Sequence, residues 1–424
     1  MFRLKKYTKI NLTYAWFALI ILASLNIMNY ADRSIFNALM DPIKSDFKFN
    51  DLQLGWLASA FLFVYAIAAY PLARIADKGI RKAVLIPGVL LWSVATFFTG
   101  WSHSFFHLFL ARSILGIGEA SYATTLAPLL TDYFPSAMRS TVLGLANAPL
   151  GIGTALGYYV AGLSAMHFGW RHAFFYLGIP GVLLGIVAMF LREPEMGLSD
   201  RQEQKEKPNK EIPHQEALKS LFGTKTLRYL WLSQILSTFA LGGMLVWIAA
   251  LLHRHYGFTV ADAAIDGGTA AVVGSVLGVC IGGIAADWWG RIAVNGPIWV
   301  VILGTALSGV SLTVLFHVTG RMNALYCVGA IAFFQMAING PFLAAMMNVT
   351  FPNIRSTCNA VYLFLIHVFG DASSPPVIGY LSHRMGDLKS ALQFLPWVTL
   401  LAAIIAGGAL FHYGKEKREM LGSL

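Results

Sequence analysis

The sequence predicts an all-α polytopic membrane protein with twelve transmembrane helices in two six-helix bundles. Three observations support this fold class. The chain of 424 residues is 57% hydrophobic and only 12% charged, with a mean hydropathy of +0.62, which is too apolar for a water-soluble protein of this size. Apolar runs long enough to cross a bilayer recur along its whole length. Two short motifs of the first half return in the second half.

A membrane-spanning helix needs roughly 20 apolar residues. The expected spans lie near residues 12–38, 52–73, 83–101, 105–130, 140–165, 172–191, 227–252, 266–286, 293–316, 321–347, 357–382 and 391–413. Because the basic start of the chain precedes an apolar run without a cleavage site, we expect a retained first span rather than a signal peptide.

The stretch between the sixth and seventh spans has mixed charge and several prolines, which indicates a solvated linker. We therefore expect an N-terminal bundle over residues 1–191, a linker over 192–225 and a C-terminal bundle over 226–424.

The basic residues predict the orientation. Twenty-two of the 31 lysines and arginines fall on the side of the termini and the linker, and seven on the opposite side. By the positive-inside rule, we expect cytoplasmic termini and an inner or plasma membrane location. The net charge of +10 is spread over many short loops, so nucleic acid is not an expected partner.

Enzyme motifs are missing from the sequence. The three cysteines lie without metal or disulfide spacing, and His103 and His107 have no clear third ligand, so we expect no metal site. A nucleotide-binding loop, a nucleophile elbow and an HExxH motif are also absent. We expect no catalytic activity, no cofactor and a monomer.

The first predicted span carries charges that lipid cannot accommodate. One helical face collects a polar stripe of Asn26, Asn29, Tyr30, Arg33 and Asn37, and Asp32 lies about 100° to the side of Arg33. An unpaired charge in hydrocarbon costs several kcal/mol. This helix is therefore expected to line a water-accessible cavity.

The fourth predicted span adds Arg112 and Glu119, which share a face because they are seven residues apart, with Gly116 between them for close helix approach. A static ion pair is the structural alternative. However, these two residues together with Asp32 and Arg33 supply more charges than one structural ion pair requires. Apolar walls favour a neutral carboxyl and a nearby arginine favours a charged one. Asp32 and Glu119 are therefore candidate proton carriers, and Arg33 and Arg112 are candidate anion contacts.

The eleventh predicted span carries a second polar group of residues. His367, Asp371 and Ser374 follow i, i+4, i+7 spacing just before Pro375 and Pro376 interrupt the helix. A lone histidine is more often a packing residue, but an intramembrane aspartate one turn away favours a substrate site. Tyr158 on the fifth span is a further candidate, with core packing as its alternative.

The repeated motifs place charges at the cytoplasmic ends of helices. Ala73-Arg-Ile-Ala-Asp77-Lys-Gly-Ile-Arg81-Lys82 is matched by Gly283-Ile-Ala-Ala-Asp287-Trp-Trp-Gly290-Arg291. In the same way, Phe134-Pro135-Ser-Ala-Met-Arg139 is matched by Phe351-Pro352-Asn-Ile-Arg355. We expect Asp77, Arg81, Asp287 and Arg291 to act in gating, with purely topogenic charge as the alternative.

These motifs resemble those of the major facilitator superfamily. The Asp77 and Asp287 segments are similar to its loop signature G-x-x-x-D-[RK]-x-G-[RK]-[RK], although the first copy has Ala73 and Ile80 at glycine positions and the second has Trp288 after the aspartate. Arg112-x-x-x-Gly116-x-Gly118-Glu119 matches the fourth-helix signature. The resemblance implies two six-helix bundles related by a parallel repeat.

Three further stretches resemble the Spinster family of lipid and lysolipid transporters: Asn29-Tyr30-Ala-Asp32-Arg33, Gly118-Glu119-Ala-Ser-Tyr122 and His367-Val-Phe-Gly370-Asp371-Ala-Ser-Ser-Pro375. The resemblance implies that Asp32, Arg33 and Glu119 take part in proton coupling and substrate response. It also implies that His367 contacts an amphipathic substrate.

The sequence as a whole indicates a proton-coupled secondary transporter that works by alternating access in a lipid bilayer. The expected substrate is an amphipathic or anionic solute such as a lysophospholipid or a sphingolipid-like molecule. A carrier of small organic anions or drug-like compounds is the alternative within transport. A non-transporting membrane receptor is the alternative outside it.

Overall fold

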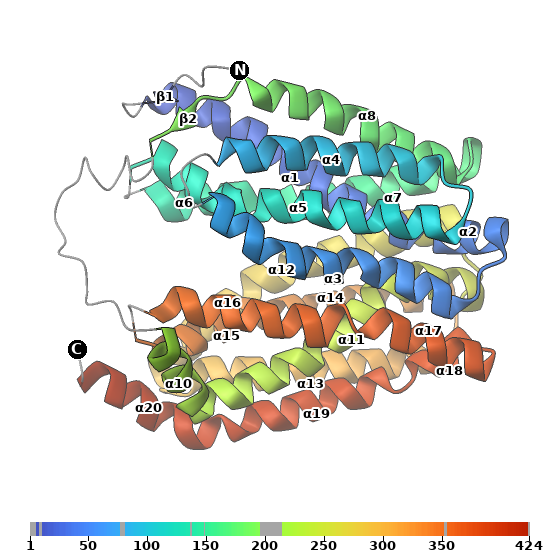
Figure 1. Ribbon diagram of the computed structural model, residues 1–424. Coiled ribbons are helices and arrows are strands. Elements are labelled where there is room, and N and C mark those ends of the chain that lie inside the picture. Colours follow the sequence, from blue (N-terminus) through green and yellow to red (C-terminus); the bar gives the residue numbers. More distant parts are fainter. Residues whose placement is uncertain are drawn as a thin grey trace. The chain divides into compact units, whose positions relative to one another are not determined.

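The computed structural model of the chain describes residues 6–7, 11–76, 81–135, 138–147, 149–195, 214–351 and 354–422 (Figure 1). It contains two compact units. The N-terminal unit comprises Met1–Phe49 and Trp56–Glu206, and the C-terminal unit comprises Asn50–Gly55 and Lys207–Leu424. Much of the expected linker lies outside the described residues, which resume at His214.

The N-terminal unit is helical apart from one short pair of parallel strands, in which Lys6 aligns with Glu193. Its elements in chain order are β1 (Lys6–Tyr7), α1 (Leu12–Ala38), α2 (Met40–Phe47), α3 (Asp51–Ala76), α4 (Lys82–Gly100), α5 (Phe105–Tyr133), α6 (Arg139–Asn147), α7 (Pro149–His167), α8 (Trp170–Met189) and β2 (Glu193–Pro194). The first turn of α3 belongs to the C-terminal unit. Local signals begin two of these helices, because the side chains of Asn11 and Ser104 accept backbone N–H groups at the starts of α1 and α5.

The described part of the C-terminal unit is entirely helical beyond that turn. Its elements are α10 (His214–Gly223), α11 (Lys225–His255), α12 (Val260–Ile292), α13 (Gly296–His317), α14 (Arg321–Ala337), α15 (Asn339–Asn348), α16 (Arg355–Ile366), the π-helical turn η3 (His367–Asp371), α17 (Ser374–Met385), α18 (Leu388–Leu392), α19 (Leu395–Gly408) and α20 (Leu410–Gly422). In Figure 1, α16, η3 and α17 follow one another along a single line.

Ten helical segments among the described residues are long and apolar enough to cross a membrane. The remaining two expected spans, 105–130 and 140–165, fall on α5 and on α6 with α7, which are not among these ten. The all-α fold class is confirmed, and the count of twelve spans stays a prediction.

Prolines lie at two interruptions within segments that the sequence analysis drew as single helices. Pro341 lies just after the junction of α14 and α15, and Pro396 is the second residue of α19, after the break that follows α18. Proline has no backbone N–H, so the carbonyl four residues earlier loses its helical partner. The helices are interrupted at these points, although Arg321–Asn348 and Leu388–Gly408 are each long and apolar enough to cross a membrane as one segment.

Each unit has its own hydrophobic core. In the N-terminal unit the core contains the fully buried Trp92, Tyr133 and Phe134. In the C-terminal unit the core contains the fully buried Phe342 and Tyr413. The charged residues discussed below are therefore held by helices that pack within one unit.

Glycines bring helix backbones into direct contact in both units. A Cβ atom at Gly157 of α7 would lie 2.4 Å from the Ala31 carbonyl oxygen of α1, next to Asp32. On α12, Cβ atoms added at Gly274, Gly278 and Gly282 would lie 2.0 to 2.1 Å from backbone carbonyl oxygens of α14. Only glycine permits such backbone approach, as in the small-residue interfaces of membrane helices.

We expect Gly278→Val to destabilise the protein by about 3 kcal/mol, the upper end of the usual range for overpacking, because backbone cannot move aside as a side chain can. The free energy of unfolding, followed by tryptophan fluorescence in a denaturant titration, measures the effect. Gly283→Val is the matched control, since a Cβ atom there meets nothing within 4 Å. Equal stability of the two variants would contradict the packing role of Gly278.

Candidate functional site

The N-terminal unit gathers four ionisable side chains from two helices. Asp32 and Arg33 come from α1, and Arg112 and Glu119 come from α5. Glycine contacts fix the backbones that carry them, since a Cβ atom at Gly116 would lie 2.5 Å from the Phe61 carbonyl oxygen of α3. Three of these side chains belong to residues that are at most 3% exposed.

Arg33 and Glu119 form an ion pair. The Arg33 Nε atom donates to Glu119 Oε2 at 2.7 Å, and the Glu119 side chain is fully buried whereas that of Arg33 is 26% exposed. The rings of Tyr30, Phe61 and Tyr65 surround the guanidinium at 4.9 to 5.3 Å. Such rings attract a cation through their π faces, so they stabilise the positive charge of Arg33.

Asp32 makes a different contact. Its Oδ2 atom accepts a hydrogen bond from the Thr96 hydroxyl of α4 at 3.0 Å. Neither Asp32 Oδ1 nor Glu119 Oε1 has a hydrogen-bond partner among the described residues, although both atoms are buried. A buried carboxylate oxygen without a partner carries a large desolvation cost, which binding of a proton relieves.

Arg112 is buried among aromatic rings and backbone. Its guanidinium carbon lies 4.3 Å from the centre of the Phe36 ring and 5.2 Å from that of Phe61. Its Nε atom donates to the Leu57 carbonyl oxygen at 3.4 Å. The residue is only 3% exposed, so Arg33 is the more accessible of the two arginines to a solute.

The polar stripe of the first helix divides into two parts. Asn26 and Asn29 are each 3% exposed, and the Asn26 amide donates to the Ala146 carbonyl oxygen of α6 at 2.7 Å. Asn26 therefore satisfies a helix carbonyl, and the expectation that the helix lines a water-accessible cavity stays a prediction. Tyr158 is buried on α7 with 5% exposure.

In the C-terminal unit, His367 and Asp371 lie at the two ends of η3. The His367 Nδ1 atom and Asp371 Oδ2 are 2.9 Å apart, and their side chains are 29% and 19% exposed. The expected proline break is present, but the chain responds with a π-helical turn before Ser374 and the two prolines. Such single π turns are often found at functional sites. Gly242 of α11 packs on Asp371, since a Cβ atom there would lie 2.6 Å from the Asp371 Cβ atom.

The expected gating residues have different surroundings. Asp77 lies outside the described residues. Arg81 pairs with Asp132 of α5 and donates to the Pro128 carbonyl oxygen at 2.9 Å. Asp287 and Arg291 are exposed near the end of α12.

Glu193 of β2 is a residue that the sequence analysis missed. Its two carboxylate oxygens accept the backbone N–H groups of Arg81 and Lys82, each at 3.0 Å, and so cap the start of α4 from 111 to 112 residues away in the chain. Burial raises the pKa of the Glu193 carboxyl, although the two backbone hydrogen bonds and the nearby basic groups act in the opposite direction. Nothing in the local sequence indicates this long-range cap.

The first turn of α3 holds a second missed group. Asp51 receives two hydrogen bonds from Arg254 of α11, at 2.9 and 3.1 Å, and one from the Ser382 hydroxyl of α17 at 2.6 Å. Asp51 is 6% exposed. A bidentate Arg–carboxylate pair is among the stronger polar contacts in proteins, so this clamp fixes three elements of the C-terminal unit.

The Major Facilitator Superfamily family model matches residues 22–375 of the chain. The chain therefore belongs to the Major Facilitator Superfamily. It is a multi-pass integral membrane transporter and not an enzyme, as its composition and motifs predicted.

Among curated proteins it is similar to Spinster transporters. It is 24% identical to Protein spinster of Drosophila melanogaster over 381 residues, which cover 87% of this chain and 62% of that protein. It is 27% identical to the sphingosine-1-phosphate transporter SPNS2 of Xenopus tropicalis, covering 95% of this chain and 83% of that one. It is 28% identical to an MFS-type efflux pump of Mycolicibacterium smegmatis, and the match covers 94% of this chain and 92% of that protein.

Among solved structures the chain is similar to a bacterial homolog of the human lysosomal transporter Spinster, in its inward-facing and unoccupied conformation. The TM-score is 0.79 at 22% identity, and the match covers 96% of this chain and 98% of that one. This likeness supports the fold.

The raised pKa of Glu193 predicts how its contribution to stability depends on pH. The native state holds the proton more tightly than the unfolded chain does, so this contribution is present at low pH and is lost as the pH rises from the unfolded value through the raised pKa. We expect the free energy of unfolding of the wild type, minus that of Glu193→Gln, to decrease as the pH rises over that interval. Unfolding midpoints of both proteins across the acidic range measure it, and a difference that grows with pH would contradict the assignment.

Proposed function

We propose that the protein is a proton-coupled secondary active transporter in which Asp32 and Glu119 carry protons. The observation that supports this proposal best is the buried Arg33–Glu119 pair at 2.7 Å beside a second buried acid, with one oxygen of each carboxyl lacking a partner among the described residues. Ionisable residues inside membrane spans are costly and usually functional.

The pair would act as a switch because its two members have competing partners. While Glu119 is ionised, its negative charge keeps Arg33 in the ion pair. Once Glu119 takes up a proton, the attraction between them weakens and Arg33 becomes available to an anionic group of the substrate. Binding of an anion and binding of a proton at Glu119 would then favour each other, as linkage requires. The membrane potential would add about 2.3 kcal/mol per charge per 100 mV.

We propose an amphipathic anion as the substrate, of the lysophospholipid or sphingolipid-like class. Arg33 and Arg112 would contact the anionic group, and Tyr158, His367 and Asp371 would contact other parts of the molecule. Two facts support this class: the partial exposure of Arg33 among aromatic rings, and the similarity to a sphingosine-1-phosphate transporter.

A carrier of small organic anions or drug-like compounds is the second candidate. The similarity to an MFS-type efflux pump over 94% of this chain favours it. Saturable uptake of a small organic acid, with no competition from lysolipids, would select this alternative over the first.

The transport cycle is proposed to be alternating access by a monomer in the inner or plasma membrane, with cytoplasmic termini as the positive charges indicate. Asp77, Arg81, Asp287 and Arg291 would act in gating. Arg81 already has an acidic partner within its own unit, Asp132, so its role would require exchange of partners during the cycle.

We expect Glu119→Gln to reduce proton-driven uptake about 100-fold, the lower end of what a positioned proton-transfer group contributes, while the protein still folds. The substitution keeps the shape of the side chain but removes its titratable proton. Uptake of radiolabelled lysophosphatidylcholine into liposomes under an imposed pH gradient measures the effect. Glu216→Gln, an exposed acid on α10, is the control. Wild-type coupling in the Glu119 variant would refute its role.

We expect Arg33→Ala to weaken binding of an anionic probe, lysophosphatidic acid, by about tenfold to 100-fold, because a charge-assisted contact contributes about 1.5–3 kcal/mol. Equilibrium binding to purified protein measures it. Lys44→Ala on α2 is the matched control, and Arg33→Lys distinguishes loss of charge from loss of fold. Equal losses in the Arg33→Ala and Lys44→Ala proteins would place the anion site elsewhere.

A further inference from the structure

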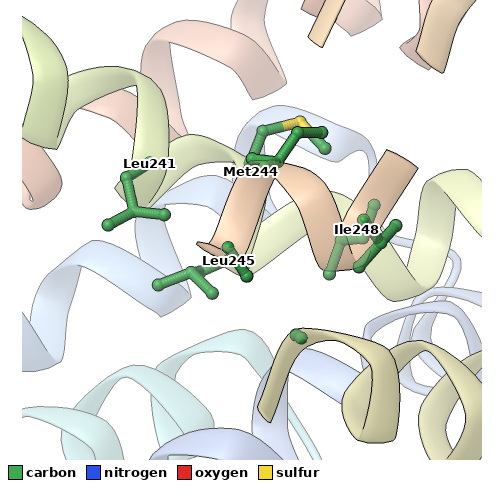
Figure 2. Close-up of a pocket in the computed structure, with 8 residues that line it drawn as sticks. Leu241, Met244, Leu245 and Ile248 are labelled. Carbon is green, nitrogen blue, oxygen red and sulfur yellow. The ribbon is translucent and has the colours of Figure 1, made fainter. Parts of the chain in front are cut away.

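The apolar hollow in the C-terminal unit has no polar side chain that would recognise a ligand. Figure 2 shows it beside Leu241, Met244, Leu245 and Ile248 of α11, and the rest of its wall is equally apolar. Its volume of about 30 Å³ is that of one water molecule. Directional polar contacts lie instead in the N-terminal unit, around Asp32.

Thr96 uses its hydroxyl differently from the neighbouring threonine on α4. The Thr99 hydroxyl donates to the Ala95 carbonyl oxygen four residues earlier, at 2.9 Å, and Thr125 of α5 makes the same kind of bond within its own helix at 2.7 Å. The Thr96 hydroxyl donates to Asp32 Oδ2 of α1 at 3.0 Å, and both residues are at most 3% exposed. Thr96 therefore gives up the local bond that a helical threonine commonly makes.

An alternative acceptor for this hydroxyl lies one turn earlier on α4, at the Trp92 carbonyl oxygen. While Asp32 is ionised, its charge-assisted bond to Thr96 is about twice as strong as a bond between neutral groups. A proton on Asp32 removes this advantage, and the buried Oδ1 atom, which has no partner among the described residues, is available to take it. The Trp92 carbonyl then competes for the hydroxyl, and threonine bonds of this kind bend helices.

The Trp92 turn packs on the residue that precedes Glu119. A Cβ atom added at Gly118 of α5 would lie 2.6 Å from the Trp92 Cβ atom and 2.8 Å from the Trp92 backbone nitrogen. One turn earlier on α4, a Cβ atom added at Gly88 would lie 3.0 Å from the Gly118 carbonyl oxygen. Because backbones in such close contact leave no space to absorb a movement, a bend of α4 at this turn displaces the backbone that carries Glu119.

The charged groups that act on the Asp32 carboxyl come from α5. The charge of Glu119 disfavours a charge on Asp32, and the charge of Arg112 favours it. Arg33, the next residue in the chain, is paired with Glu119, and α7 packs Gly157 at this level of α1. Because the two charges on α5 act in opposite directions, one hydrogen bond at Oδ2 can decide at which pH Asp32 takes up a proton.

We propose that Thr96 is a positioning residue with two states. Its hydroxyl donates to Asp32 while this acid is ionised, and it moves to the Trp92 carbonyl when Asp32 takes a proton from the aqueous phase. The resulting bend of α4 communicates the protonation of Asp32 to Glu119 through Gly118. The inference rests on the proposed function in taking Asp32 and Glu119 as proton carriers.

The first test measures protonation of Asp32 in the full chain, in phosphatidylcholine nanodiscs. Infrared difference spectra across pH follow the band of protonated carboxyl groups, and the part that Asp32→Asn removes identifies Asp32. Without the hydroxyl the ionised acid loses a donor, so the proton binds at higher pH. We expect Thr96→Val, or Thr96→Ala if valine prevents folding, to raise the midpoint of this titration by about one pH unit, a tenfold change typical of one charge-assisted hydrogen bond.

Two variants separate this effect from a general change of packing. Thr96→Ser keeps the hydroxyl and should leave the midpoint within about 0.3 pH unit of the wild type. Thr99→Val is the matched control, because it removes an equally buried hydroxyl of α4 whose bond stays within that helix. The proposal is overturned by an unmoved midpoint in Thr96→Val, an equal shift in Thr99→Val, a shift that Thr96→Ser shares, or an Asp32 carboxyl that never titrates.

A double-mutant cycle tests the link to Glu119, whose infrared band is the part that Glu119→Gln removes. The change that Asp32→Asn causes in the midpoint of the Glu119 titration is measured with Thr96 and with Thr96→Val. Direct interaction between the acids survives the threonine substitution, whereas the path through α4 does not. We expect a smaller change in the Thr96→Val background, by more than about 0.3 pH unit, the usual error of additivity. Equal changes would overturn the communication with Glu119.

Uptake into liposomes distinguishes this inference from the proposed function. Infrared midpoints that shift as expected, in a wild-type protein without proton-driven uptake, would refute transport and leave the exchange of Thr96 in place. Proton-driven uptake by the wild type, together with an unmoved midpoint in Thr96→Val, would refute the exchange alone.

Discussion

The structure depends on the burial of charge among helices that otherwise present apolar side chains. Glu119 is fully buried and Asp32 almost so, which would destabilise the unit by several kcal/mol if these groups were charged and isolated. Arg33 offsets the charge of Glu119, and the hydroxyl of Thr96 supports Asp32. A change in the protonation of either acid therefore alters the contacts that hold α1 against α4 and α5.

Close helix contact makes this geometry possible. A glycine lies opposite or beside a candidate site residue in both units: Gly157 packs on Ala31 next to Asp32, and Gly242 packs on Asp371 itself. A side chain at either position would push the helices apart, since an added Cβ atom would lie 2.4 Å from the Ala31 carbonyl oxygen or 2.6 Å from the Asp371 Cβ atom. The glycines are therefore as necessary to the sites as the charged residues are.

Much of this was predictable from sequence, because periodicity and charge are local properties. The all-α class, the helical ranges and the grouping of Asp32, Arg33, Arg112 and Glu119 follow from spacing and from the cost of buried charge. Thr96 could not be singled out, since one threonine in an apolar helix carries no signal. The partners of Asp51 and Glu193 depend on contacts 111 or more residues away, which no local pattern encodes. The π turn at His367 replaced the simple break that the prolines predicted.

The two units share a helical architecture but hold their acid–base pairs in different ways. In the N-terminal unit the ion pair joins two helices, so a proton at Glu119 changes the contact between α1 and α5. In the C-terminal unit His367 and Asp371 lie on one turn of the same segment, so their interaction changes the shape of that turn and not the distance between helices. The two acid–base pairs therefore differ in what they hold together: the first links two helices, and the second lies within a single turn.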